Sequence, residues 1–254
     1  MILDSFKLNG KVALVTGAGR GLGQGMAIAL AEAGAEIASL GRGGCEATCE
    51  SVRALGRRFH ASVVDLRAAS VADLNLTVAQ ILKEFGHIDI LVNNSGTIRR
   101  SPAIEFSETD WDDVLQIDLK AAFFLSQAVG RTMMSQHSGK IINIASMLSF
   151  QGGINVLSYT AAKSGLAGIT RALANEWAKH GINVNAIAPG YMATDNTEAL
   201  RADPIRSKSI LERIPAGRWG LPNDLKGAVV FLASSASDYV HGAILPVDGG
   251  WLAR

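Results

Sequence analysis

The chain has very little cysteine and no cluster of metal-binding side chains. Its two cysteines, Cys45 and Cys49, are four residues apart, and no second pair of ligands accompanies them. This spacing excludes a disulfide framework and argues against a structural zinc site, so we expect two reduced thiols. The five histidines show no ligand-like spacing either, and we therefore predict a protein without a metal site.

A charge excess of one sign and long apolar runs are also missing. The 24 basic and 23 acidic side chains give a formal net charge of +1, which argues against nucleic acid or a membrane surface as a partner. No apolar run approaches the roughly 18 residues of a membrane span. Residues 1–5 lack the basic and apolar regions of a signal peptide, and we expect a cytoplasmic protein.

Short apolar segments alternate with helix-length amphipathic segments along the whole chain. Hydrophobic residues make up 48% of the 254 residues, which suits a sheet that is buried on both faces. The alternation predicts an α/β fold, a single-domain Rossmann-type doubly wound parallel sheet of about seven strands with helices on both faces, spanning residues 1–254. The expected strands are Val12–Val15, Ile37–Leu40, Ala61–Val64, Ile88–Val92, Ile141–Ile144, Ile182–Ile187 and Ala243–Val247. The expected helices are Gly23–Ala33, Val71–Glu84, Asp110–Gln136, Ser158–His180 and Pro222–Ser234.

One stretch departs from this alternation. Residues 191–219 follow the sixth expected strand and are rich in charged side chains. Because ligands bind at the carboxyl ends of the strands in such sheets, we predict a mobile substrate lid here. A surface helical insertion without a role in the reaction is the alternative.

A glycine-rich loop follows the first expected strand. Gly17, Gly21 and Gly23 lie between this strand and an expected helix. Glycines permit close backbone approach, and the free N–H groups of a helix N-terminus attract a pyrophosphate. We therefore predict a dinucleotide cradle that includes Arg20 and Leu22, with an ordinary turn between strand and helix as the alternative.

Polar residues end the third and fourth expected strands. Asp65 and Leu66 end the third strand, where an acid accepts a hydrogen bond from an adenine amino group. A helix N-cap is the alternative role for Asp65. Residues 93–96, from Asn93 to Gly96, close the fourth strand and let the chain pass closely beneath a cofactor, although a simple turn has the same composition.

A serine, a tyrosine and a lysine are the candidates for proton transfer. Tyr159 and Lys163 are four residues apart, one turn along the same helix face, and Ser146 follows the fifth expected strand. A phenol with an ordinary pKa of about 10 is a poor acid–base catalyst, and a neighbouring ammonium group lowers that pKa. With a hydroxyl that holds a substrate oxygen, this set predicts the interconversion of an alcohol and a carbonyl.

These motifs together resemble the classical short-chain dehydrogenase/reductase family over nearly the full length of the chain. The resemblance implies an oxidoreductase that uses NAD(H) or NADP(H), with Tyr159 as acid/base, Ser146 on the substrate oxygen and Lys163 on the cofactor ribose. It also implies that Thr194 orients the cofactor carboxamide. The residues that carry the resemblance or that it assigns to cofactor binding are Thr16 to Gly23, Asp65, Leu66, Asn93 to Gly96, Ser146, Tyr159, Lys163, Pro189, Gly190, Met192 and Thr194.

Three further segments, residues 142–153, 188–194 and 214–220, resemble one branch of that family. The branch contains the 2-deoxy-D-gluconate 3-dehydrogenases and the 2-dehydro-3-deoxy-D-gluconate 5-dehydrogenases. The resemblance implies carbohydrate metabolism and a small sugar-acid substrate whose hydroxyl and ketone forms are interconverted.

Arg99 and Arg100 follow the fourth strand, and a guanidinium group there can pair with the carboxylate of a sugar acid. Two solvated loop arginines are the alternative. We expect Arg100, Gln151 and Trp219 to contact the substrate beside Ser146 and Tyr159.

Two positions depart from the family pattern. Ser95 replaces an alanine, which is a small change. The family's fourth catalytic residue, an asparagine that helps to hold a water in a proton relay, aligns with Asp118. Asp118 accepts the same hydrogen bonds but donates none, and in its ionised form it raises the pKa of Lys163. We place Asp118 in the catalytic set and leave the relay open.

The choice of cofactor is balanced. NAD enzymes commonly have an acid at the end of the second strand, where it binds the ribose 2′-OH. Here Gly41 and Arg42 stand at that point. Arg42, together with Arg20 in the glycine loop, fits a 2′-phosphate and slightly favours NADP(H), whereas the branch resemblance favours NAD(H).

Two other functions compete with this interpretation. A 3-oxoacyl carrier-protein reductase has the same fold, but the near-neutral charge argues against a basic docking face. A non-catalytic dinucleotide-sensing protein does not need an intact Ser–Tyr–Lys set. Apolar residues on more than one face of the long helices, and in residues 249–252, lead us, with the family resemblance, to expect a homotetramer.

Overall fold

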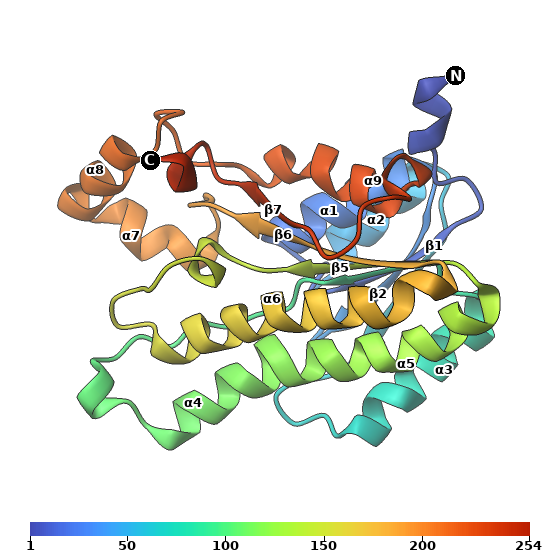
Figure 1. The fold of residues 1–254 in the computed structure, drawn as a ribbon, viewed down its shortest axis with the longest axis horizontal. Coiled ribbons are helices and arrows are strands. Elements are labelled where there is room, and N and C mark those ends of the chain that lie inside the picture. Colours follow the sequence, from blue (N-terminus) through green and yellow to red (C-terminus); the bar gives the residue numbers. More distant parts are fainter.

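The computed structural model describes residues 1–254 and contains one seven-stranded sheet between two layers of helices (Figure 1). The strands are all parallel, in the order β3-β2-β1-β4-β5-β6-β7. This arrangement confirms the predicted fold class. The strands are β1 (Val12–Thr16), β2 (Glu36–Gly41), β3 (Phe59–Val63), β4 (Ile90–Asn93), β5 (Gly139–Ile144), β6 (Ile182–Pro189) and β7 (Ile244–Val247).

The helices α1, α2 and α9 lie on one side of the sheet, and α3 to α6 lie on the other (Figure 1). Local sequence sets their ends: the Ser70 hydroxyl caps α3 by accepting from the Asp73 N–H, and α3 ends at Gly86 with φ 87°. No helix combines the length and the apolar character that crossing a membrane requires. The helices are α1 (Gly21–Glu32), α2 (Glu46–Ala54), α3 (Val71–Phe85), α4 (Glu108–Leu115), α5 (Ala121–Gln136), α6 (Leu157–Trp177), α7 (Glu198–Ala202), α8 (Pro204–Arg213) and α9 (Lys226–Ala233).

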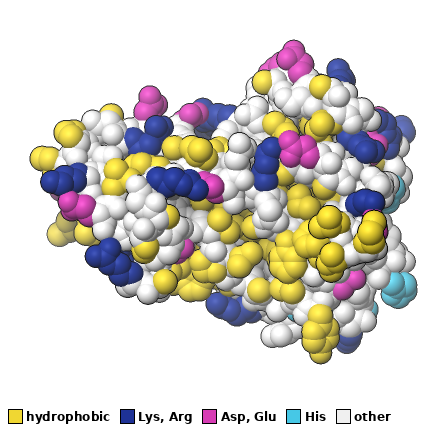
Figure 2. Space-filling model, turned by 90° about the horizontal axis from the view of Figure 1, so that it is seen from above, with side chains coloured by type: hydrophobic (Ala, Val, Ile, Leu, Met, Phe, Trp, Pro, Cys, Tyr) yellow, Lys and Arg dark blue, Asp and Glu magenta, His cyan; other side chains and the backbone are white.

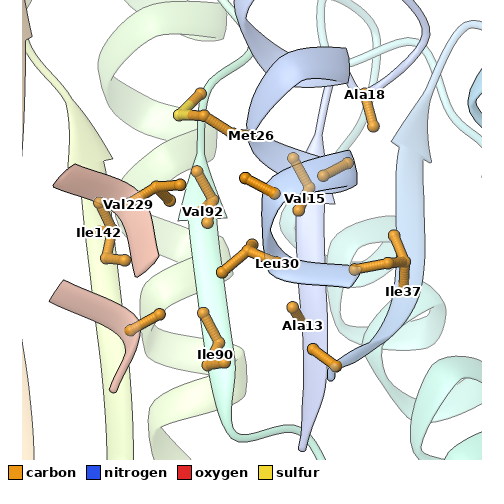
Figure 3. Close-up of a cluster of buried hydrophobic side chains, with 14 of the residues drawn as sticks. Ala13, Val15, Ala18, Met26, Leu30, Ile37, Ile90, Val92, Ile142 and Val229 are labelled. Carbon is orange, nitrogen blue, oxygen red and sulfur yellow. The ribbon is translucent and has the colours of Figure 1, made fainter. Parts of the chain in front are cut away.

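Both faces of the sheet are packed, so the inner strands are apolar at nearly every position. Ala13 and Val15 of β1 lie in the core that α1 and α9 cover, together with Leu30 of α1 (Figure 3). Val12 and Leu14 of the same strand lie in the second core, against α3, α5 and α6. Successive side chains of a strand point to opposite faces, which explains the unbroken apolar runs in the sequence.

The order of the strands reverses at β1, which pairs with β2 on one side and β4 on the other. Such a switch point opens a crevice beyond the carboxyl ends of the strands. Because all seven strands are parallel, the residues that follow them meet at one edge of the sheet. Gly17, Asn94, Ser146 and Gly190 follow β1, β4, β5 and β6, and they all line the same cavity.

Two helical features differ from the expectation. Helix α2 was not predicted, because its short apolar stripe lies between glycines and charged residues. The expected helix over residues 110–136 is present but contains a π-helical turn, Gln116–Lys120, between α4 and α5. A π turn adds one residue to a helical turn without changing which residue types are apolar, so the hydrophobic periodicity does not reveal it.

Residues 191–219 form a separate unit that contains α7 and α8. Its two ends are held together, because the Ala193 N–H donates to the Gly220 carbonyl at 2.7 Å and the Gly220 N–H donates to the Tyr191 carbonyl at 2.9 Å. The unit therefore emerges from the edge of the sheet on a short, closed stem.

Candidate active site

A cavity of about 1290 Å³ extends along the carboxyl ends of the strands. It runs from the glycine loop and the end of β2 to Ser146, Tyr159 and the segment that holds α8. Nearly all of the residues predicted for cofactor and substrate binding line it. Those that do are Gly17, Arg20, Gly21, Leu22, Gly23, Arg42, Asp65, Leu66, Gly96, Arg100, Ser146, Gln151, Tyr159, Lys163, Pro189, Gly190, Met192 and Thr194.

The glycine loop has the geometry of a cradle for a phosphate group. Gly17 and Gly21 have φ angles of +69° and +56°, which side chains rarely adopt. A Cβ atom on Gly23 would collide with the carbonyl oxygen of Gly17, so the helix approaches the loop too closely for any side chain there. No side chain caps the start of α1, which leaves its first N–H groups free for an anion.

Hydrogen bonds join the glycine loop to the turn after β4. The Thr16 hydroxyl accepts from the N–H groups of Asn94 and Ser95 at 2.9 and 2.8 Å. The Asn94 side-chain amide donates to the Thr16 carbonyl at 2.9 Å. These bonds fix the two walls of the crevice in one position.

Asn93 corrects one sequence-based assignment. Its side chain does not line the cavity but lies buried behind it, donating to the Asn143 side-chain oxygen at 2.9 Å and to the Ser126 hydroxyl at 3.0 Å. In a strand the side chains alternate between faces, so Asn93 points away from Asn94, and Asn94 is the residue that faces the crevice. The Asn93 side chain therefore supports the crevice from behind and does not face into it.

At the far end of the cavity, Arg42 follows β2 directly and is exposed. Arg20, in the glycine loop, also lines the cavity, and its Nη1 contacts the Asp195 carboxylate at 2.8 Å. Asp65 accepts from the Arg67 N–H at 3.0 Å and lines the cavity. The helix N-cap role considered for Asp65 is wrong, because Ser70 caps the next helix.

The floor of the cavity brings together the three residues expected to move protons. Tyr159 and Lys163 lie on α6, and the Lys163 Nζ is 5.4 Å from the centre of the Tyr159 ring. Lys163 is 3% exposed and donates to the Ile144 carbonyl at 2.9 Å. Ser146 lies two residues after the end of β5, and its hydroxyl accepts from the Leu148 N–H at 3.2 Å. The strand and the helix thus place a hydroxyl, a phenol and an ammonium group around one point.

The environment of the phenol differs from the simple expectation that Lys163 lowers its pKa. Burial raises the pKa of Tyr159 above its ordinary value. The Lys163 ammonium opposes this effect and a hydrogen bond to Ser146 does the same, but the Asp118 carboxylate adds to it. The protonated phenol is therefore the prevailing form at neutral pH in the free protein, which suits proton donation to a ketone.

Asp118 reaches this set from the π-helical turn. It is 1% exposed, its Oδ1 accepts from the Thr97 N–H at 2.7 Å, and its Oδ2 lies 3.2 Å from the Lys163 Nζ. Oδ2 faces the ammonium as an ion pair without a well-aligned hydrogen bond. Burial lowers the pKa of Lys163, but Asp118 and Tyr159 outweigh burial and raise it overall. Burial raises the pKa of Asp118, against the effects of Lys163 and Thr97.

We expect Asp118→Asn to move the acid limb of the pH profile for alcohol oxidation to lower pH. Oxidation needs the phenolate, so its rate falls as the pH drops through the pKa of Tyr159. Since Asp118 raises that pKa, removing its charge lowers the pKa. The measurement is kcat/KM against pH, with the exposed Asp112→Asn as a control on the same stretch of chain. An acid limb that stays in place or moves to higher pH contradicts the prediction.

The substrate end of the cavity is rich in arginine. Arg100, Arg206 and Arg213 line it, and none of the three pairs with a carboxylate. Arg99 differs, because its guanidinium group pairs with Asp110 and Asp113 at 2.9 and 3.2 Å. Of the two adjacent arginines predicted to bind a substrate carboxylate, only Arg100 lines the cavity.

Trp219 corrects a second assignment. It does not line the cavity but packs behind it, with its ring centre 5.6 Å from that of Tyr191. Trp251 lines the cavity instead and is 5% exposed. The apolar C-terminal segment thus packs inside its own chain, so it is not evidence for a partner subunit. Sequence reasoning missed Trp251 because nothing local links residue 251 to α8.

Fold and site together define a nucleotide-dependent oxidoreductase with a Ser–Tyr–Lys set. Residues 17–252 match the family model described as enoyl-(acyl carrier protein) reductase. The chain belongs to the short-chain dehydrogenase/reductase family, and it is an NAD(P)-dependent enzyme that interconverts alcohol and carbonyl groups.

The chain is similar over its full length to a particular group of enzymes. The 2-dehydro-3-deoxy-D-gluconate 5-dehydrogenase of Escherichia coli (strain K12) is 62% identical, and the match covers 100% of both chains. A solved structure from Agrobacterium tumefaciens with bound NADP is 55% identical, with a TM-score of 0.92 over 99% of this chain and 100% of that one. The gluconate 5-dehydrogenase of Burkholderia cenocepacia J2315, in complex with NADP and tartrate, is 39% identical, with a TM-score of 0.95 and full coverage of both chains.

Proposed function

We propose that this enzyme interconverts a hydroxyl and a ketone on a small sugar acid of the 2-dehydro-3-deoxy-D-gluconate or 2-deoxy-D-gluconate type. The full-length identity of 62% to an enzyme named for the first of these compounds carries the proposal. The arginines at the substrate end of the cavity, which lack carboxylate partners, fit an anionic substrate.

Each residue of the site has a role in this reaction. Tyr159 takes the proton of the hydroxyl in oxidation and returns it to the ketone oxygen in reduction. Ser146 donates a hydrogen bond to the same oxygen, and Lys163 keeps positive charge beside the phenol. The nicotinamide cofactor, when bound, supplies or accepts the hydride. The glycine loop fits its pyrophosphate, because free N–H groups and close backbone approach meet there.

Purified protein mixed with reduced or oxidised cofactor and a panel of sugar acids tests this function. The absorbance of the reduced nicotinamide reports turnover. We expect turnover of a 2-dehydro-3-deoxy or 2-deoxy sugar acid, and little turnover of neutral sugars or of a 3-oxoacyl thioester. Preferred turnover of the thioester would instead support an acyl carrier-protein reductase, and no turnover at all would support a dinucleotide-sensing protein.

We further propose a preference for NADP(H). Arg42 stands at the end of β2, where an acid would bind the ribose 2′-OH. Arg20 contributes less, because it is paired with Asp195. Two solved relatives are described with bound NADP, which supports the proposal. We also propose a cytoplasmic location. The two free cysteines, Cys45 and Cys49, stay reduced in that compartment.

Residues 191–219 serve in this proposal as a lid over the substrate. The closed stem at Ala193 and Gly220 holds the unit over the cavity, and any movement of the unit would carry the C-terminal segment with it, because the Ala216 N–H donates to the Gly249 carbonyl at 3.0 Å. Thr194 lies at that base, and a Cβ atom on Gly21 would come within 3.6 Å of its methyl group. The position of Thr194 beside the cradle supports a contact with the cofactor carboxamide.

We expect the enzyme to be a homotetramer. Strand β7 is at the edge of the sheet, and hydrophobic side chains gather across the face that α9 and β7 share (Figures 1 and 2). Val230, Phe231, Ile244 and Leu245 are only partly buried there, and a second copy would cover them. Light scattering at micromolar concentration should give about four times the 26.7 kDa chain mass. A monomer mass contradicts this expectation.

A further inference from the structure

We propose that Arg213 binds the carboxylate of the substrate and is a specificity-determining residue of this enzyme. This inference rests on the proposed function and extends it to a residue of α8 that no sequence motif singled out.

The guanidinium group of Arg213 is held in place at the cavity wall. Its Cζ lies 3.9 Å from the ring centre of Trp251, and its Nη2 donates to the Gln151 side-chain oxygen at 3.3 Å. A guanidinium that stacks on an aromatic ring keeps its N–H donors in the plane and directed sideways. The remaining donors of Arg213 have no partner in the protein, so they are free for an anion with two oxygens.

The C-terminal segment makes this arrangement rigid. The Asp248 carboxylate accepts from the N–H groups of Gly250 and Leu252, both at 2.9 Å, which fixes the turn that carries Trp251. The Arg254 side chain then donates to the Glu212 carbonyl at 3.0 Å, on the last turn of α8. A side chain that is ordered before binding loses less conformational entropy on binding, which strengthens the contact.

The charges around the cavity favour an anion at this point. The acids that line the whole cavity are Asp65 and Asp195, and Asp195 is already paired with Arg20. Arg100, Arg206 and Arg213 therefore leave the substrate end with uncompensated positive charge. Such a charged crevice attracts anions and raises their local concentration.

Arg213 is better placed for this role than its two neighbours. Arg100 has a single hydrogen bond, at 3.4 Å to the Asn196 carbonyl, and no aromatic support. Arg206 lies two turns earlier on α8, and although both arginines are exposed, Arg206 has no aromatic ring beneath it. A bidentate contact needs fixed geometry as well as charge, and only Arg213 has a stacked ring and a side-chain amide to fix it.

The test is the binding of tartrate, a small hydroxy dicarboxylate, to the NADP-loaded enzyme by isothermal titration calorimetry, with the neutral polyol threitol as comparison. We expect Arg213→Gln to weaken tartrate binding by about 10-fold or more, the usual effect of losing charge-assisted hydrogen bonds. The tartrate affinity of Arg213→Lys should fall between those of the wild type and Arg213→Gln. Lysine keeps the positive charge but lacks the planar guanidinium group that can make two parallel hydrogen bonds to a carboxylate. Lys208→Gln removes a charge from an exposed position of the same helix that does not line the cavity, and we expect less than about a 3-fold change.

Kinetics on the sugar acid separate a binding role from a structural one. Arg213→Gln should raise KM about 10-fold or more and change kcat little, because the carboxylate lies away from the reacting carbon. NADP affinity and Tm should be unchanged. Equal losses for Lys208→Gln and Arg213→Gln, unaltered tartrate binding in Arg213→Gln, or a wild type that binds tartrate no better than threitol would each overturn the proposal. Because tartrate binding needs no turnover, failure to oxidise any sugar acid would defeat the proposed function separately.

Discussion

Replacement of Tyr159 by phenylalanine is expected to lower kcat by about 10²–10⁴-fold, the usual loss when a positioned proton donor or acceptor is removed. The change deletes one oxygen and keeps the ring beside Lys163, so the fold should be unaffected. Steady-state kcat in both directions measures the loss, and the thermal midpoint Tm shows whether the variant is folded.

A matched control exists in the same chain. Tyr239 is fully exposed and does not line the cavity, so Tyr239→Phe removes the same atom without touching the site. Its kcat should equal that of the wild type. If Tyr159→Phe also keeps wild-type kcat, Tyr159 is not the acid/base of this reaction.

Arg42→Ala is expected to weaken NADP(H) binding by about 10- to 150-fold, because a lost charge-assisted contact is worth about 1.5–3 kcal/mol. NAD(H) has no 2′-phosphate, so its affinity should change little. The measurement is the dissociation constant of each cofactor by fluorescence titration.

Arg53→Ala provides the control for long-range charge. Arg53 lies on α2, just beyond Arg42, but does not line the cavity. Arg53→Ala removes the same net charge as Arg42→Ala and should leave the affinities for NADP(H) and NAD(H) near the wild-type values. Equal losses for the two cofactors in Arg42→Ala, or a wild type that prefers NAD(H), would contradict the proposed preference.

The fold could be predicted because its signals are local and repeated. The inner strands are mostly apolar on both faces, the glycine loop and Ser146 lie just after two of them, and Tyr159 lies in the first turn of α6. In an all-parallel sheet, the end of a strand has one possible place, which is the shared carboxyl edge. The residues near these ends can therefore be assigned to the crevice from the sequence alone.

The parts that were not predicted depend on geometry over longer distances. Asn93 and Asn94 have the same side-chain chemistry, and only the strand pleat decides that Asn94 faces the crevice. The contact between Asp118 and Lys163 depends on a π turn that apolar spacing does not encode. Arg213 meets Trp251 only because the last residues return beneath α8, a pairing between two segments 38 positions apart (251 minus 213) that no local pattern marks.

The C-terminal segment, residues 248–254, limits where a fusion partner can be attached to this protein. Trp251 lines the cavity, and three residues later the Arg254 side chain donates to the backbone of α8, which helps to hold Trp251 against that helix. The N-terminal residues project from the other end of the molecule, beyond α9 (Figure 1). Affinity tags, reporters and surface anchors therefore belong on the N-terminal side, since an addition after Arg254 would disturb the turn that holds Trp251 at the cavity wall.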